Sequence, residues 1–203
     1  MTKKKPKVRK SGRREKSPDL VKRVAGLKRP ELLELWASIE AKKAFDWPPG
    51  KAFELCILRA FELEGAEVHW PYLVEIQDSV VEEIDGFVQT ERVGFMVESK
   101  DLSDAVGIGP VAKLRNQLAR RPGGLLGCIF SRSGFTPPAV ILSTYCAPQA
   151  ILLWNGNEIA DALKSENMIV ALNQKYDWLL RMGLPDWEFL TEENKEHDNV
   201  HHN

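Results

Sequence analysis

The sequence predicts an α/β fold in which a central mixed β-sheet is flanked by helices. Segments with the helical spacing of apolar residues come first, at 32–45 and 51–64. Three strand-like segments then follow one another closely, which favours antiparallel neighbours. Short, wholly apolar runs at 125–130 and 150–154 alternate with helical segments. That alternation is typical of parallel strands that are buried on both faces of a sheet.

Each element has a local signal. The helix at 51–64 carries Phe53, Ile57 and Phe61 on one stripe, and Gly65 follows its end. The next three segments are rich in β-branched residues and are separated by polar turns. Strands are expected at 67–76, 80–88, 93–100, 125–130 and 150–154, and further helices at 110–121, 137–145, 158–163 and 168–181. The central order is therefore αβββαβ.

The later helices begin and end at proline and glycine. Pro110 suits the first turn of a helix, and the Pro-Gly-Gly sequence at 122–124 ends it. Thr136 followed by Pro137 resembles an N-cap with proline at the first helical position.

Composition indicates one globular domain with charged ends. The chain has 203 residues, 43% of them hydrophobic, and a formal net charge of −1. Residues 1–16 hold nine Lys or Arg and one Glu, a net charge of +8, so residues 17–203 carry −9. The basic arm is either a tether to a phosphate backbone or a solubilising tail.

Cysteine usage and hydropathy point to the cytoplasm. Cys56, Cys128 and Cys146 lie in apolar runs without metal-binding spacing, so we expect buried, reduced thiols. No apolar run approaches the length of a membrane span, and the N-terminus lacks the apolar region of a signal peptide.

One stretch carries residues suited to metal chemistry. Asp85 lies within the second expected strand, and Glu98 and Lys100 leave the same face at the end of the third. Two carboxylates could hold a hard divalent cation, and the lysine could orient a water or neutralise a phosphoryl group. The alternative is that Asp-Gly is a turn and Glu-x-Lys a solvated face. The helix residue Glu54 either is solvated or faces the sheet and adds an outer metal contact.

With this element order, Asp85…Glu98-Ser99-Lys100 resembles the PD-(D/E)XK nuclease superfamily and its restriction-endonuclease-like fold. Within it, residues 50–163 are most similar to Mrr-type restriction endonuclease domains. The similarity rests on Glu54, IDG at 84–86, VESK at 97–100, KLRNQLARRP at 113–122, IFSRSGFT at 129–136 and ILLWNGNEI at 151–159.

The resemblance implies a role for each matching residue. Asp85, Glu98 and the carbonyl of Ser99 would hold Mg²⁺, or Mn²⁺ in its place. Lys100 would position the attacking water and offset charge on the phosphate, and Glu54 would stand near the metal. Ile84 occupies the position of the motif's proline, whose side chain performs no chemistry.

The helix after the motif offers a basic stripe for DNA. We expect phosphate contacts from Lys113, Arg115, Gln117, Arg120 and Arg121, while Arg115 and Arg120 could instead pair with the acidic core. The resemblance thus implies a Mg²⁺-dependent DNA endonuclease of restriction or defence, acting as a homodimer or with a targeting partner. The alternatives are a non-catalytic nucleic-acid-binding or assembly module and a nuclease for branched DNA or RNA.

The expected organisation has five parts. They are a basic disordered arm at 1–18, an N-terminal helix at 28–46, the nuclease domain at 50–163, a packed C-terminal helix at 164–185 and an acidic, frayed tail at 186–203. No separate specificity domain is recognisable, so the sequence names no target.

Overall fold

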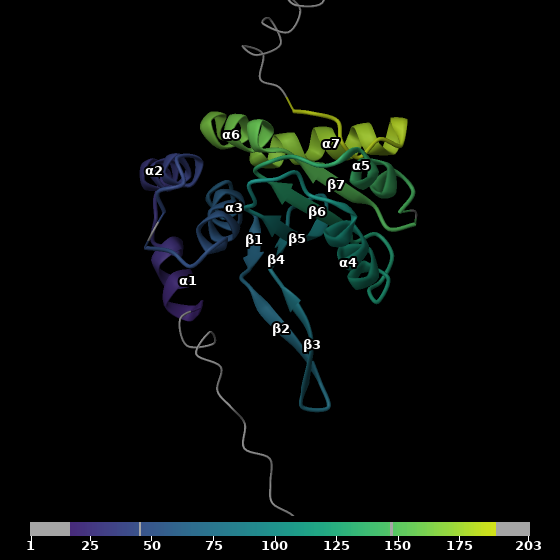
Figure 1. Cartoon of the computed structure of the whole chain (residues 1–203), viewed down its shortest axis with the longest axis horizontal. Helices are drawn as coiled ribbons and strands as arrows, with labels where there is room; N and C mark the ends of the chain where they lie inside the picture. Colours follow the sequence, from purple (N-terminus) through teal and green to yellow (C-terminus); the bar gives the residue numbers. More distant parts are fainter. Residues whose placement is uncertain (1–16, 45, 147, 190–203) are drawn as a thin grey trace, which may run out of the picture.

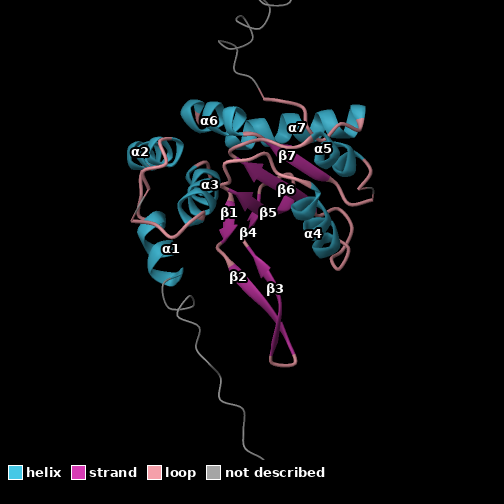
Figure 2. Cartoon of the chain, in the orientation of Figure 1, coloured by secondary structure: helices cyan, strands magenta, loops and turns pink. Residues whose placement is uncertain are grey.

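A five-stranded mixed sheet forms the centre of the computed structural model, which describes residues 17–44, 46–146 and 148–189 (Figures 1 and 2). Its order is β1-β4-β5-β6-β7. The first three strands pair antiparallel and the last two are parallel to β5. Their bounds are β1 Glu67–His69, β4 Gly86–Gln89, β5 Gly94–Lys100, β6 Leu126–Ser131 and β7 Ile151–Trp154. The predicted mixed sheet is confirmed.

Helices cover both faces of this sheet. On one face, α3 packs on the sheet together with α6 and α7, and α1 and α2 lie outside α3; α4 and α5 cover the other face (Figure 1). The helices are α1 Ser17–Ala25, α2 Arg29–Glu40, α3 Lys51–Leu63, α4 Ile108–Leu118, α5 Pro137–Thr144, α6 Gly156–Ser165 and α7 Met168–Met182.

Strand alternation divides the core into two layers. In β5, Phe95 and Val97 pack with the α3 layer, whereas Met96 packs with the α4 layer. The side chain of Phe61 on α3 sits edge-on to Phe95, with ring centroids 5.1 Å apart. Burial on both faces explains why these strands read as continuous apolar runs.

The first two predicted strands are each divided. The first predicted strand is interrupted at Trp70-Pro71, between β1 and β2 (Tyr72–Ile76). The second is interrupted at Asp85, between β3 (Ser79–Ile84) and β4. Pro71 has no N–H to donate to a ladder, which favours a break there. The outer halves β2 and β3 pair only with each other and form a hairpin that projects from the sheet (Figure 1). Asp85 therefore lies at a junction between two strands. The prediction that it lies within a strand is wrong.

The described ends also differ from expectation. The helix at α1 was not predicted, and α2 is shorter than the helix expected at 28–46. Residues 186–189 are not frayed, because Phe189 is buried and Trp187 stacks on Trp178 with ring centroids 5.8 Å apart. The basic arm at 1–16 and the acidic tail at 190–203 lie outside the described residues.

The three cysteines are buried and free, as predicted. Burial raises the pKa of Cys56 to about 12, so this thiol stays protonated. Within the described part of the chain, none of the helices combines the length and the apolarity that a membrane crossing requires.

Candidate active site

Asp85, Glu98, Ser99 and Lys100 meet at the carboxyl end of β5. Because β4 and β5 are antiparallel with Gly86 opposite Val97, the residue before β4 lies beside the end of β5. The Oδ2 atom of Asp85 accepts the Ser99 amide at 2.8 Å and the Ser99 hydroxyl at 3.1 Å. Its Oδ1 atom has no hydrogen-bond partner among the described residues. The fold thus joins groups that stand 13 to 15 positions apart in the sequence.

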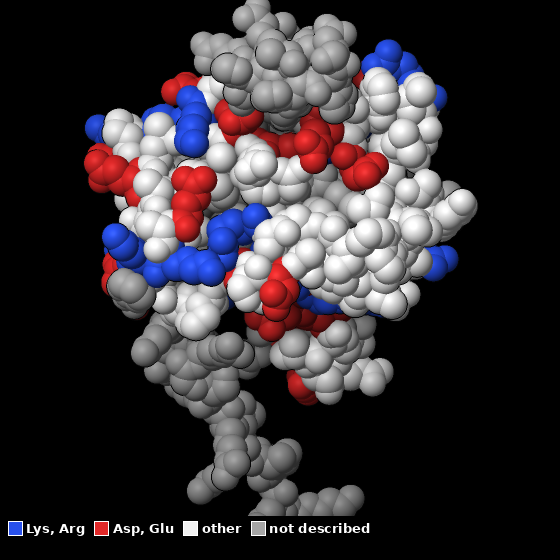
Figure 3. Space-filling view, turned by 45° about the horizontal axis from the view of Figure 1, so that its top comes forward, with Lys and Arg blue, Asp and Glu red and all other residues white. Residues whose placement is uncertain are grey.

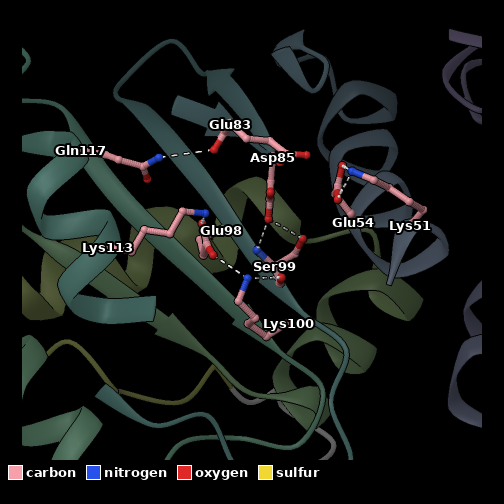
Figure 4. Close-up of polar contacts among 9 residues, drawn as sticks. All are labelled: Lys51, Glu54, Glu83, Asp85, Glu98, Ser99, Lys100, Lys113 and Gln117. Atoms are coloured by element: carbon pink, nitrogen blue, oxygen red, sulfur yellow. Dashed lines mark hydrogen bonds and ion pairs between the residues drawn. The ribbon is translucent and has the colours of Figure 1, made fainter. Parts of the chain in front are cut away.

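The carboxylate of Glu98 is held between two lysines. Glu98 is 1% exposed. Its Oε1 accepts Lys100 Nζ at 2.5 Å, and its Oε2 accepts Lys113 Nζ of α4 at 2.6 Å (Figure 4). Lys100 also donates to the carbonyl of Ser99 at 3.2 Å. A buried carboxylate needs such partners to remain charged.

Glu54 faces the site from α3. It is 6% exposed and accepts Lys51 Nζ at 2.6 Å with each of its oxygens (Figure 4). Burial, followed by the charge of Asp85, raises the pKa of Glu54 to about 7, against the opposing effect of Lys51. Of the two interpretations of Glu54, the structure therefore supports the one in which it faces inward.

Gly86 lets α3 approach this strand. A Cβ atom at this position would lie 2.5 Å from Cδ2 of Leu58, one turn after Glu54 on α3. The Asp-Gly pair is thus a place of close packing between helix and strand, which a larger residue would disturb.

Most of the predicted DNA-binding stripe is engaged within the protein. Lys113 contacts Glu98, and Gln117 Nε2 donates to the Glu83 carbonyl at 3.4 Å. Arg120 and Arg121 both pair with Glu82. Arg115 is exposed. On the face drawn in Figure 3, basic side chains form a short band at the left, acidic side chains lie above and below it, and most of the right side is uncharged.

These contacts attach the hairpin to α4 and to the residues directly after it. Glu82 is buried, and Arg121 and Arg120 lower its pKa against the effect of burial. Together with the Gln117 contact, they anchor β3 shortly before Asp85.

Sequence reasoning missed several polar partners. The pairing of Lys51 with Glu54 follows the i,i+3 spacing of a helix, so it was readable from the sequence. The contacts of Glu82 with Arg120 and Arg121 and of Glu98 with Lys113 join distant segments, so no local sequence pattern predicts them.

The residues offer oxygen ligands for a cation, but not a complete side-chain cluster. Within the described ranges, no group of three or more His, Cys, Asp or Glu is arranged to hold a metal. The available donors are two carboxylates, from Asp85 and Glu98, and the Ser99 carbonyl between them.

The fold and this arrangement define an α/β protein with acids and a lysine converging at the end of a sheet. Residues 47–163 match the family described as Restriction endonuclease, of the Mrr catalytic type. The match covers more than half of the chain, so the protein belongs to this restriction endonuclease family. No protein of curated function is significantly similar to it.

Similar solved structures share low sequence identity with this chain. A protein of unknown function, AF1548, is 20% identical at a TM-score of 0.43, with 63% of this chain and 75% of that one covered. The restriction endonuclease MspJI, in complex with a 27-mer oligonucleotide, is 19% identical at a TM-score of 0.41. The similarity covers 74% of this chain and 35% of MspJI. The DNA modification-dependent restriction endonuclease AspBHI is 17% identical at a TM-score of 0.42. The similarity covers 81% of this chain and 40% of AspBHI. This chain thus spans well under half of the latter two proteins.

Proposed function

We propose that this protein is a metal-dependent DNA endonuclease that hydrolyses phosphodiester bonds, in restriction or defence against foreign DNA. One observation carries the proposal. Asp85, Glu98 and Lys100 converge at the end of β5, within a domain of the restriction endonuclease family.

The donor set fits Mg²⁺, or Mn²⁺ in its place. Both ions prefer carboxylate and carbonyl oxygens, which Asp85, Glu98 and Ser99 present here. Burial contributes most to the raised pKa of Glu54, and the charge of Asp85 adds to it, so the two carboxylates repel each other. A cation would relieve this repulsion. When bound, it would supply a hydroxide nucleophile at neutral pH and positive charge beside the phosphate.

The protein's own groups then have distinct tasks. Asp85 is oriented by the amide and hydroxyl of Ser99, both of which donate to Oδ2, so Oδ1 remains available to a ligand. The ammonium group of Lys100, held by Glu98 and the Ser99 carbonyl, positions water and stabilises negative charge that develops on the phosphate. Glu54 interacts electrostatically with Asp85 and so adds to the negative charge that attracts a cation. It would contact the cation from its outer shell.

DNA is the proposed partner, contacted through Arg115 and the neighbouring cations of α4. Cleavage of both strands would require a homodimer or two successive events, since one such site cuts one strand. A separate targeting protein would supply sequence selection.

The alternatives differ in what they predict for activity. A non-catalytic binding or assembly module would bind nucleic acid without cutting it, and a nuclease for branched DNA or RNA would leave plasmid intact. The presence of both acids and the lysine supports catalysis.

Plasmid cleavage tests the proposal. Supercoiled plasmid, unmodified or methylated, is incubated with Mg²⁺ or EDTA and either wild-type protein, Glu98→Ala or Asp85→Ala. We expect Mg²⁺-dependent nicking or linearisation, reduced at least about a hundredfold in both variants, because loss of a ligand removes several kcal/mol of transition-state stabilisation. Glu34→Ala, an exposed change on α2, controls for charge. Equal cleavage by Glu98→Ala and wild type would reject this site.

A further inference from the structure

The two lysines on Glu98 occupy both oxygens that the proposed metal would need. Lys100 Nζ lies 2.5 Å from Oε1, and Lys113 Nζ lies 2.6 Å from Oε2. A divalent cation on either oxygen would come within a few ångströms of an ammonium group, and like charges at that distance repel strongly. Metal binding would therefore weaken the attraction between Glu98 and its lysines, and we expect one of them to move.

Lys113 is the lysine that is free to leave. The side chain of Lys100 is 27% exposed and has a second acceptor in the Ser99 carbonyl, whose two lone pairs can serve both the ammonium group and a cation. The Lys113 side chain is 44% exposed, and Glu98 is its one hydrogen-bond acceptor among the described residues. It projects from α4 on a flexible four-carbon stem, so a rotation releases it without moving the strand (Figure 4).

The charges around Lys113 explain what holds it in place. Burial opposes its charged form, but the hydrogen bond and charge of Glu98, with Asp85 and Glu83, raise the pKa of Lys113. Its ammonium group is thus, with that of Lys100, a counterion of the acidic site. A cation bound to Glu98 and Asp85 would cancel this attraction, while DNA would bring phosphate oxygens to the same place.

We propose that Lys113 is a metal-gated phosphate-binding residue: it neutralises Glu98 in the free protein and turns to a non-bridging oxygen of the DNA near the scissile phosphate when the metal takes its place. This inference rests on the proposed function. It assigns one residue two successive partners, and so couples metal binding to DNA binding.

The test compares DNA affinity with and without a cation that does not support cleavage. The affinity of a DNA duplex for wild type and Lys113→Gln is measured by fluorescence anisotropy in Ca²⁺ and in EDTA. We expect Lys113→Gln to weaken binding about tenfold in Ca²⁺ but only about twofold in EDTA, because Glu98 already holds the lysine there. If Lys113 faced the DNA at all times, Lys113→Gln would lose the same amount of DNA affinity in Ca²⁺ and in EDTA. This result would overturn the proposal.

Two matched variants support the comparison. Arg115→Gln removes an exposed positive charge from the same helix, and its loss of affinity should be the same in Ca²⁺ and EDTA. Lys164→Gln makes the same substitution at an exposed position on α6. Melting temperatures show whether each variant is folded.

Metal binding without DNA separates this inference from the proposed function. By calorimetry with Mn²⁺, Lys113→Gln should bind about three- to tenfold more tightly than wild type, because the competing ammonium is gone, and Glu98→Ala should not bind. If Glu98→Ala binds Mn²⁺ like wild type, the proposed metal site itself fails. If only Lys113→Gln departs from expectation, by binding no more tightly, the gating role alone is rejected.

Discussion

The buried ion pair between α6 and α7 offers the largest predicted effect on stability. Lys175 is 1% exposed and Glu158 is 2% exposed, and Lys175 Nζ lies 2.5 Å from Glu158 Oε1. Lys175 also donates to the Trp187 carbonyl, and Glu158 Oε1 accepts the Phe189 amide at 2.9 Å. The pair therefore fastens the segment after α7 to the core.

Replacing Lys175 with Met keeps most of the side-chain length but leaves Glu158 buried without its cation. Removal of one partner of such a pair typically costs about 3–5 kcal/mol. Burial already raises the pKa of Glu158, and without Lys175 it rises further. The deficit in free energy of unfolding should thus be largest at neutral pH and shrink as the pH falls and Glu158 takes up a proton.

Urea denaturation, followed by circular dichroism and tryptophan fluorescence at several pH values, measures this deficit. The double variant Lys175→Met/Glu158→Gln should recover much of the loss, since no charge is then buried. Arg92→Met breaks an exposed pair with Asp177 and should leave stability nearly unchanged. A loss below about 1 kcal/mol for Lys175→Met at pH 7 would contradict the reasoning.

Two further predictions concern the active site. The pKa of Glu54 lies at about 7 in the fold instead of 4.5, so its contribution to stability is present at low pH and lost as the pH rises through 7. Glu54→Gln should therefore stabilise the protein at pH 8, by up to ~3 kcal/mol, and flatten its stability between pH 5 and 7; an unaltered pH profile from denaturation would argue against inward burial of this charge. Lys100→Met should slow plasmid cleavage about a hundredfold or more while Mn²⁺ still binds in calorimetry. Equal loss of rate and metal affinity would make Lys100 structural.

Local patterns predicted most of the central fold. The apolar runs at 125–130 and 150–154 correspond to β6 and β7, and Phe53, Ile57 and Phe61, which the sequence placed on one helical stripe, are buried together in the core. The two early strands were predicted too long, because β-branched residues continue through Pro71 and Asp85. Propensity alone does not reveal where one strand changes its pairing partner.

The sequence by itself determined which chemical groups are available: two carboxylates and a lysine within 16 positions, with Glu98 and Lys100 on the same face of a strand. Only the tertiary structure decided how those charges are compensated. Lys113 reaches Glu98 from another element, and Arg120 and Arg121 bind Glu82 instead of remaining open on a basic stripe. Such pairings depend on packing between segments far apart in the chain. A buried carboxylate takes the nearest cation that the fold supplies, and spacing along the sequence does not report that distance.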